Sequence, residues 1–331
     1  MINPYIGNEW QLSGVEEYSM LGGKKEGMRI VHVRNGLGLD LYISLDRGGD
    51  ICNLTYQGKN VNYLTPNGLV SSKYFDPKGD GWIKSFTAGF ITTCGLENVG
   101  SPNVDQGEEL GLHGSRSQIP VENWGYDEDE ESFDIKTVLR DEGIFKRKWK
   151  IIRHIIVSKV ENIFSIQDEI INTSGEEQPL EYLFHINFGY PLLSEDSEIY
   201  IASDKVKARN KHAEEDIANW AKMEKPQVGY EERCYYHHMK TKEGKAAIFN
   251  QKAGFGACLS FDSSVLDCFT EWKMMGFRDY VLGLEPGNCT PDGRDQVRKQ
   301  GILKFVKAND AVIYRVDVSI LKDHKEFLKL K

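Results

Sequence analysis

Most of the chain consists of short segments in which apolar and polar residues alternate, with turn residues between them. Alternation with a period of two indicates a strand with one buried face. Residues 28–34 and 37–45 flank Asn35-Gly36, a dipeptide that strongly favours a hairpin turn. The same pattern predicts later strands at residues 132–140, 144–158, 163–172, 246–250, 256–261, 280–284, 302–307 and 311–321.

Helical periodicity is scarce. Residues 212–222 form the best helix candidate, and residues 322–330 predict a terminal helical turn. Turns are predicted at 141–143 and 160–162, and the acidic stretch 127–131 is typical of a solvated hairpin tip. Many strands, few helices and frequent turns predict an all-β protein, an antiparallel β-sandwich or barrel. Without a linker, composition break or repeat, we expect one domain over residues 1–331.

Composition narrows the possible functions. The 331 residues are 40% hydrophobic and 27% charged, which indicates a globular protein. The net charge of -9 and the lack of a basic stripe disfavour a nucleic-acid partner, whereas a neutral sugar remains compatible. Residues 1–10 do not resemble a signal peptide, and no apolar run approaches membrane-spanning length. We therefore expect a cytoplasmic protein that does not associate with membranes.

The six cysteines are scattered and form no C-x-x-C pair, so we expect reduced thiols and neither a disulfide framework nor a zinc site. His237 and His238 are adjacent, and in a strand their rings would point to opposite faces, which disfavours a shared metal. No H-E-x-x-H motif, nucleophile elbow, phosphate loop or dinucleotide fingerprint is present. The sequence therefore predicts no metal and no cofactor.

Residues 181–191 predict a strand with two polar side chains on one face. Alternation puts His185 and Asn187 on the same side, with the aromatic and aliphatic residues of the segment on the other. This pair could act on a ligand. It could equally be a core histidine with its hydrogen bonds satisfied beside a turn-forming asparagine.

A second strand, residues 279–288, places Gly283 and Glu285 on one face. Gly283 has no side chain, so another group can lie over the sheet at that point. Pro286 holds Glu285 in extended geometry, which puts the carboxylate at the end of the strand, facing the space above Gly283. The alternative is a rim carboxylate beside a Pro-Gly turn.

Three further segments contain candidate residues. The loop 111–117 carries His113 among small polar residues, and it suits either a ligand contact or an ordinary turn. Residues 269–275 predict the hairpin partner of the Glu285 strand, from which Lys273 could reach a sugar hydroxyl or simply lie at the surface. Residues 81–100 are dense in polar residues, which suggests a lined cavity or a series of bulges and turns.

The order of these segments resembles the aldose 1-epimerase, or galactose-mutarotase-like, superfamily. The resemblance rests on five stretches, spread in the expected order over most of the chain: residues 46–51 (DRGGDI), 93–100 (TCGLENVG), 112–114 (LHG), 185–189 (HINFG) and 283–288 (GLEPGN). It lies closest to a branch of poorly defined specificity. Each stretch alone is unspecific, and the set is what identifies the superfamily.

The resemblance implies a large antiparallel supersandwich with a sugar in a groove on its concave face. It implies Glu285 as general base, His185 as general acid and His113 as an auxiliary group, without a metal. The sugar-binding Arg of the superfamily precedes the loop histidine, where this chain has two candidates, Arg47 and Lys84. Its sugar-binding Asp has no clear match, and Glu232 is the candidate. Further candidate substrate-binding residues are Glu97, Asn98, Asn187 and Lys273.

We therefore expect an isomerase that interconverts the anomers of a small sugar by acid–base ring opening. A homodimer is compatible with this function. Three alternatives stay open. A hydrolase or lyase on the same fold is one, although hydrolases usually pair two carboxylates. A non-catalytic carbohydrate-binding protein is the second. A metal-dependent isomerase is the third, because His113, His185 and Glu285 could together ligate an ion.

Overall fold

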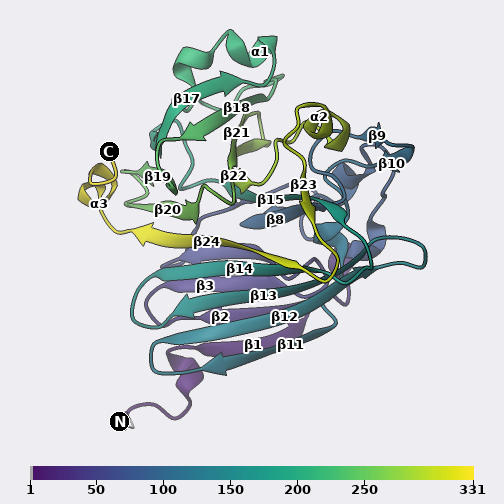
Figure 1. The fold of residues 1–331 in the computed structure, drawn as a ribbon. Coiled ribbons are helices and arrows are strands. Elements are labelled where there is room, and N and C mark those ends of the chain that lie inside the picture. The colour runs from purple at the N-terminus through teal and green to yellow at the C-terminus, as the bar shows by residue number, and fades with distance from the viewer. Residues whose placement is uncertain (1–2) are drawn as a thin grey trace.

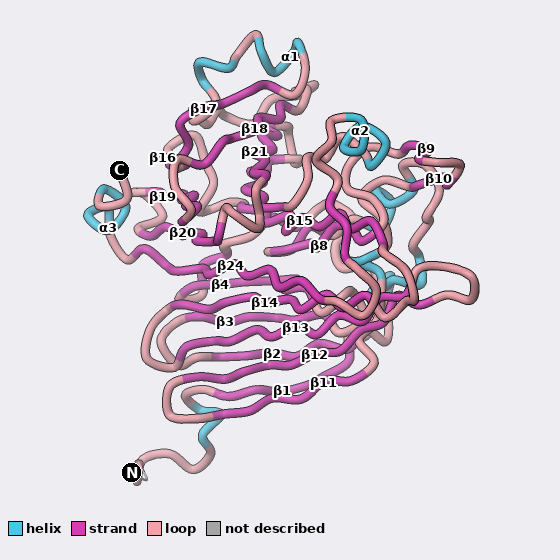
Figure 2. The backbone as a smooth tube through the Cα atoms, viewed as in Figure 1, coloured by secondary structure: helices cyan, strands magenta, loops and turns pink. Residues whose placement is uncertain are grey.

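The computed structural model describes residues 3–331, so residues 1 and 2 of the expected domain lie outside the described part. Within it the chain forms twenty-four strands, three short α-helices and six short 3-10 turns. Figure 1 shows strands stacked in layers, with the few helices at the periphery, and Figure 2 shows the same arrangement along the backbone. The predicted all-β class, with long antiparallel sheets and few helices, is confirmed.

The first sheet has five strands and contains the predicted Asn35-Gly36 hairpin. The Asn35 side chain accepts the backbone N–H groups of Leu37 and Leu39, and Gly36 takes the positive φ that the turn requires. In sheet order the strands are β1 (Gly14–Ser19), β2 (Arg29–Arg34), β3 (Leu39–Ser44), β4 (Asp50–Tyr56) and β5 (Lys59–Asn60).

The second sheet has eight strands, and its long members show the predicted alternation of buried and half-buried residues. Its order is β11 (Asn123–Glu128), β12 (Ser132–Glu142), β13 (Lys148–Ser158), β14 (Ile163–Asn172), β24 (Ala311–Leu321), β20 (Phe255–Asp262), β19 (Glu243–Asn250) and β16 (Ser197–Ile201). The turn predicted at 141–143 lies later, because the ladder between β12 and β13 extends as far as the pair Glu142–Lys148. The acidic stretch 127–131 is a hairpin tip, as predicted.

The third sheet carries the segments singled out in the sequence. Its order is β17 (Ser203–Ala208), β18 (Arg233–Met239), β21 (Cys268–Met275), β22 (Tyr280–Gly287), β15 (Gln178–Phe188) and β23 (Lys304–Val306), and β8 (Ile91–Leu96) also pairs with β15. The predicted hairpin between β21 and β22 is present, closed by the pair Met275–Tyr280. The remaining short strands are β6 (Tyr63–Leu64), β7 (Ala88–Gly89), β9 (Asn103–Asp105) and β10 (Glu108–Leu110).

The helices are shorter than predicted. The expected helix 212–222 is a single turn, α1 (Lys211–Glu214), followed by a separate 3-10 turn, Ile217–Asn219. Asn210 caps the first turn, but only Ala213 of that turn is buried, and so short a helix has little apolar contact to offset its nucleation cost. The other two helices are α2 (Arg294–Lys299) and α3 (His324–Leu328), the latter within the predicted terminal turn. Across residues 3–331 no helix is long and apolar enough to cross a membrane.

One hydrophobic core joins the three sheets. Figure 1 shows β1–β3 behind β11–β14, and the residues between these two layers belong to the same buried cluster as the underside of β15 and β22. Representative members are Leu41 and Ile43 of the first sheet, Ile151 of the second, and Phe184 and Leu284 of the third. All six cysteines are free thiols, so packing and polar contacts hold the sheets together.

A buried guanidinium fastens the three sheets at one point. Arg153 of β13 forms a bidentate ion pair with Asp168 of β14, at 2.7 Å for both contacts, and a second ion pair with Asp50 of β4. The same guanidinium donates to the Thr93 hydroxyl on β8, and the Tyr182 hydroxyl of β15 donates to Asp168. Burial alone would raise the pKa of Asp168, but Arg153 holds it below its usual value.

We predict that Arg153→Met destabilises the fold strongly, because it leaves two buried carboxylates without their cation. Loss of one partner of a buried ion pair typically costs about 3–5 kcal/mol. The free energy of unfolding, measured by urea denaturation, should fall by that amount. The control is Asp317→Asn, which breaks an exposed pair with Arg315 and should change stability by less than about 1 kcal/mol. Equal effects of the two substitutions would contradict the role assigned to Arg153.

Candidate active site

A pocket of about 350 Å³ opens on the face of the third sheet that looks away from the core. Strands β15, β18, β21 and β22 form its floor, and the 3-10 turn Gly81–Ser85 and several loops form its walls. The volume is at the lower end of the range for small-molecule sites. The lining residues are Trp82, Ile83, Phe86, Gly100, Ser101, Leu112, His113, His185, Arg209, Glu232, Cys234, Thr270, Trp272, Glu285 and Pro291.

Glu285 and His185 lie on neighbouring strands of this floor. The Glu285 Oε1 atom is 3.3 Å from His185 Nδ1, close enough for proton exchange but without the geometry of a hydrogen bond. Gly283 makes this position possible, because a Cβ atom there would lie 2.2 Å from Glu285 Oε1. The carboxylate thus folds back over the glycine, as the alternation of residues 279–288 predicts.

Burial dominates the electrostatics of this pair. Removal from water lowers the pKa of His185 to about 4, and it raises the pKa of Glu285 well above its ordinary value, with the nearby Glu232 carboxylate adding to the rise. Burial therefore disfavours the charged form of both side chains, which favours a protonated Glu285 beside an uncharged imidazole. This distribution differs from the ionised glutamate that unperturbed pKa values would give.

His113 enters the pocket from a strained loop. Its φ of +55° is rare for a residue with a side chain, and its backbone is bonded to Gly95 and Gly100 on both sides. The Gly100 N–H donates to His113 Nδ1 at 3.2 Å, which leaves the ring hydrogen on Nε2. Burial lowers the pKa of His113 well below its usual value, so the ring is a neutral hydrogen-bond donor.

Aromatic rings surround the two histidines. The Trp82 ring lies 4.7 Å from that of His113, and Phe86 and Trp272 lie 5.6 and 5.2 Å from His185. Trp and Phe faces suit the C–H faces of a sugar ring and keep water away from the polar atoms. Sequence reasoning missed these residues, although Trp82 and Phe86 belong to the polar, glycine-rich stretch that suggested a cavity.

Two charged residues stand at the edge of the pocket. Glu232, the candidate for the second sugar-binding carboxylate, lines it and accepts the Trp272 indole N–H at 2.7 Å. Arg209, which no sequence signal indicated, also lines it. Its guanidinium donates to Ser101 and to the Pro291 carbonyl.

Four buried polar atoms of the pocket residues have no hydrogen-bond partner within residues 3–331. They are Trp82 Nε1, His185 Nδ1, Thr270 Oγ1 and Glu285 Oε1. Such atoms are rare in folded proteins, because a buried polar group that loses its hydrogen bonds to water and gains none from the protein destabilises the fold. A polar ligand in this cavity would supply the partners that these four atoms lack.

Arg47 and Lys84, the two candidates for the sugar-binding cation, lie outside the pocket. Arg47 is buried and donates to the Val70 carbonyl and to the Gln118 side chain, outside the pocket. Lys84 follows two pocket residues in the turn Gly81–Ser85, yet its side chain points outward to an exposed ion pair with Asp76. Neither is among the pocket residues, so neither takes the place of the expected sugar-binding arginine in this geometry.

Lys273 lies on the wrong face of its strand for a pocket contact. Alternation in β21 directs Thr270 and Trp272 to the pocket and Lys273 to the opposite side, where it is fully buried. There its ammonium donates to the Asn219 carbonyl and lies 3.4 Å from Glu224.

Glu97, Asn98 and Asn187 support the site and do not line it. Glu97 forms an ion pair with Arg147, and Asn187 donates to the backbone carbonyl of His185. Asn98 binds three loop carbonyls, those of Gly100, Ser101 and Gly111, and so fixes the loop that holds His113.

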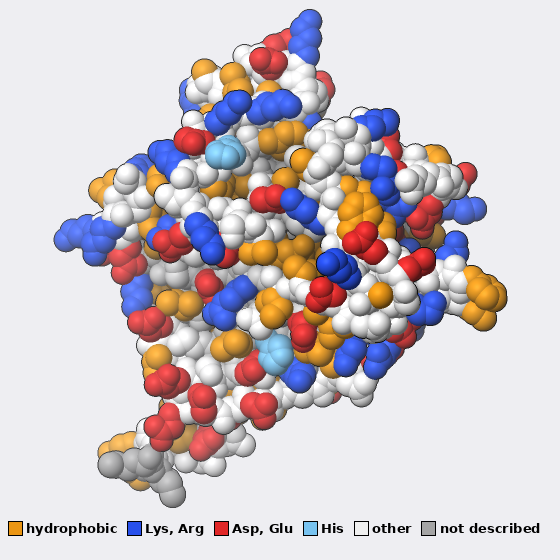
Figure 3. All heavy atoms as spheres, viewed as in Figure 1, with side chains coloured by type: hydrophobic (Ala, Val, Ile, Leu, Met, Phe, Trp, Pro, Cys, Tyr) orange, Lys and Arg blue, Asp and Glu red, His pale blue; other side chains and the backbone are white. Residues whose placement is uncertain are grey.

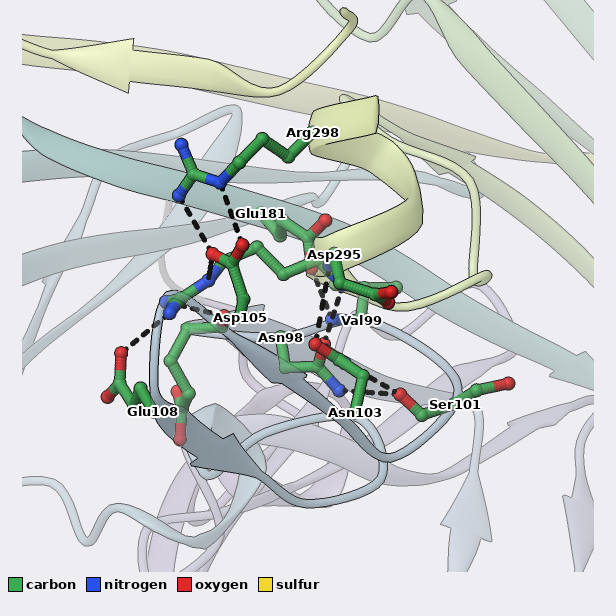
Figure 4. Close-up of polar contacts among 11 residues, drawn as sticks. Asn98, Val99, Ser101, Asn103, Asp105, Glu108, Glu181, Asp295 and Arg298 are labelled. Atoms are coloured by element: carbon green, nitrogen blue, oxygen red, sulfur yellow. Dashed lines mark hydrogen bonds and ion pairs between the residues drawn. The ribbon is translucent and has the colours of Figure 1, made fainter. Parts of the chain in front are cut away.

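Figure 4 shows how this loop is anchored. Asn103 donates to both Asn98 and Ser101, and Glu181 accepts the N–H of Val99. Arg298 forms a paired contact with Asp105. The described residues contain no group of three or more His, Cys, Asp or Glu side chains placed to hold a metal ion.

Solved structures of the same architecture exist. A candidate aldose 1-epimerase from Klebsiella pneumoniae superposes with a TM-score of 0.90 at 21% identity, over 98% of this chain and 88% of that one. A galactose mutarotase-like protein from Clostridium acetobutylicum gives 0.63 at 15%, over 94% and 99%. Galactose 1-epimerase from Lactobacillus acidophilus gives 0.64 at 11%, over 94% and 100%. The protein therefore has the galactose-mutarotase-like β-sandwich fold.

Residues 25–320 match the family described as a domain of unknown function, DUF4432, and the chain belongs to that family. A comparison with curated proteins gives no match. The residues that perform any reaction here must therefore be argued from the pocket itself.

We predict that Gly283→Ala expels the Glu285 carboxylate from its position, because the new methyl group would overlap Oε1. Crowding of this kind costs about 1–3 kcal/mol of stability. A crystal structure of the variant should show Glu285 Oε1 moved away from His185 Nδ1. The control is Gly125→Ala on β11, where an added Cβ meets no atom within 4 Å. An unmoved carboxylate in the Gly283 variant would refute this account.

Proposed function

We propose that this protein is an aldose 1-epimerase-type isomerase, which interconverts the anomers of a monosaccharide. The observation that carries the proposal is the buried His185–Glu285 pair, unbonded and 3.3 Å apart, in the floor of an aromatic-lined pocket. The fold shared with aldose 1-epimerases supports it, although fold alone does not determine activity.

The reaction needs one acid and one base. The base removes the proton from the C1 hydroxyl, its electrons form the C1=O bond, the bond from C1 to the ring oxygen breaks, and the acid protonates the ring oxygen. Rotation about the C1–C2 bond and the reverse steps give the other anomer. No atom or electron is gained or lost, and each well-placed group contributes about 10²–10⁴-fold.

We assign Glu285 as the base and His185 as the acid. Burial favours a resting pair that holds the single proton required by the cycle on Glu285. Passage of that proton to His185 produces the carboxylate and the imidazolium without exchange with solvent. Because ring closure reverses ring opening, the pair returns to its starting state after each turnover.

His113 supplies a fixed donor in this scheme. Its Nδ1 is occupied by the Gly100 N–H, so the Nε2–H of the ring is available to an oxygen of the sugar. Its low pKa keeps it uncharged, which suits a group that binds and orients the substrate and takes no proton from it.

Glycoside hydrolysis is the second candidate, and one observation favours it. Glu232 gives the pocket a second carboxylate, and such enzymes use two. Against it, Glu232 already accepts the Trp272 indole N–H. Release of nitrophenol from p-nitrophenyl glycosides, lost in Glu232→Gln, would support hydrolysis over isomerisation.

We predict that the protein accelerates anomer exchange of at least one freshly dissolved sugar after chelator treatment, as followed by proton NMR. Glu285→Gln should lower the rate by about 10²–10⁴-fold, because the amide cannot accept the proton. The matched control is Glu271→Gln, a glutamate equally buried on the neighbouring strand β21 but on the opposite face. A Glu285→Gln variant as fast as the wild type would remove the assigned base.

We predict that kcat/KM is constant from about pH 5 up to the raised pKa of Glu285, because the pair holds one proton between its two pKa values. As the pH falls through about 4, His185 takes a second proton, no base remains and the rate declines. At high pH the rate declines as Glu285 loses its proton. A decline centred near pH 6.5 would instead indicate an ordinary, solvated histidine.

A further inference from the structure

Thr270 flanks Glu285 on the side away from His185. It is the direct cross-strand partner of Glu285 in the ladder of β21 and β22, and its side chain lines the same pocket. Glu285 therefore has the strand of His185 on one side and Thr270 of β21 on the other.

The Thr270 hydroxyl is buried and has no hydrogen-bond partner among residues 3–331. Its neighbours on the same face are already bonded: the Tyr236 hydroxyl donates to Asp292, and the Trp272 indole donates to Glu232. A buried hydroxyl without a partner destabilises the fold, and valine would fill the same space without that cost. The unpaired oxygen is thus aimed at a ligand.

We propose that the Thr270 hydroxyl binds the substrate oxygen on which Glu285 acts, the C1 hydroxyl of the sugar. The proposal rests on the proposed function for the identity of the ligand. Side chains directly opposite in adjacent strands have Cβ atoms about 4.5–5.5 Å apart, so one ligand oxygen can meet both groups. As Glu285 takes the C1 proton, the oxygen gains negative charge, and the Thr270 O–H donates to it.

This placement gives Thr270 a role distinct from that of His113. His113 enters from the loop wall, whereas Thr270 belongs to the rigid floor beside the base. A donor fixed next to the developing charge stabilises the transition state more than the ground state, because it needs no rearrangement during the reaction. Its loss should therefore lower kcat more than it weakens sugar binding.

The test compares Thr270→Val, which keeps the shape and loses the hydroxyl, with Thr270→Ser, which keeps the hydroxyl. Anomer exchange of α-D-glucose, α-D-galactose and α-D-xylose is followed by proton NMR. For each sugar that the wild type turns over, Thr270→Val should lower kcat by about 10- to 100-fold, and Thr270→Ser should restore most of the rate. A wild-type rate in Thr270→Val would overturn the proposal.

The pH profile separates contact with the sugar from an effect on Glu285. If Thr270 binds the sugar, Thr270→Val lowers the rate equally at every pH between 5 and 9. If it only positions or polarises Glu285, the alkaline decline moves with the substitution, and the proposal is overturned.

Two further measurements test the Thr270 contact without requiring turnover. Trp82 and Trp272 line the pocket, so titration of tryptophan fluorescence with the same three sugars reports binding. If no sugar is turned over, weaker binding to Thr270→Val but not to Thr270→Ser would support the Thr270 contact while the proposed isomerase activity fails. The thermal midpoint of Thr270→Val should equal or exceed that of the wild type, and a fall of several degrees would show a structural role and overturn the proposal.

Discussion

The three sheets depend on the charge of one buried side chain, Arg153. Two carboxylates from different sheets, a threonine hydroxyl and a backbone carbonyl converge on its guanidinium. An ion pair at this depth contributes little net stability compared with apolar packing, but it tolerates only one arrangement of its partners. It therefore fixes how β8 and β15 lie over β13 and β14, and β15 carries His185.

The polar groups of the pocket differ from those around Arg153 in how many of their hydrogen bonds are made. The Arg153 guanidinium has partners in Asp50, Thr93 and Asp168, whereas four buried atoms of the pocket residues have no partner in the described chain. Three of these four atoms belong to strands of the third sheet, and the fourth belongs to Trp82 in the 3-10 turn Gly81–Ser85. A polar ligand in the pocket would give these four atoms the partners that they lack.

Alternation along the strands predicts the face on which each side chain lies. It placed Glu285 over Gly283, because side-chain direction in a strand follows from sequence position alone. That His185 and Glu285 belong to one site was implied only by the family resemblance, because alternation does not say which strands are neighbours. It could not tell which face of β21 is open, so Lys273 was named as a candidate for a ligand contact and Thr270 was overlooked. Arg47 and Lys84 lie outside the pocket, and their positions could not be predicted because their surroundings depend on contacts distant in sequence.

The tautomer of His113 has a consequence for molecules that would block the pocket. A ring held by a backbone N–H on one nitrogen offers only a hydrogen on the other, so it favours partners with a free lone pair. Ethers, carbonyls and lactones fit that requirement. An ammonium group does not, because both it and the His113 Nε2–H are hydrogen-bond donors. Lactones of common sugars, which are flat at C1 and carry an exposed carbonyl, are therefore the natural starting compounds for inhibitors of this pocket.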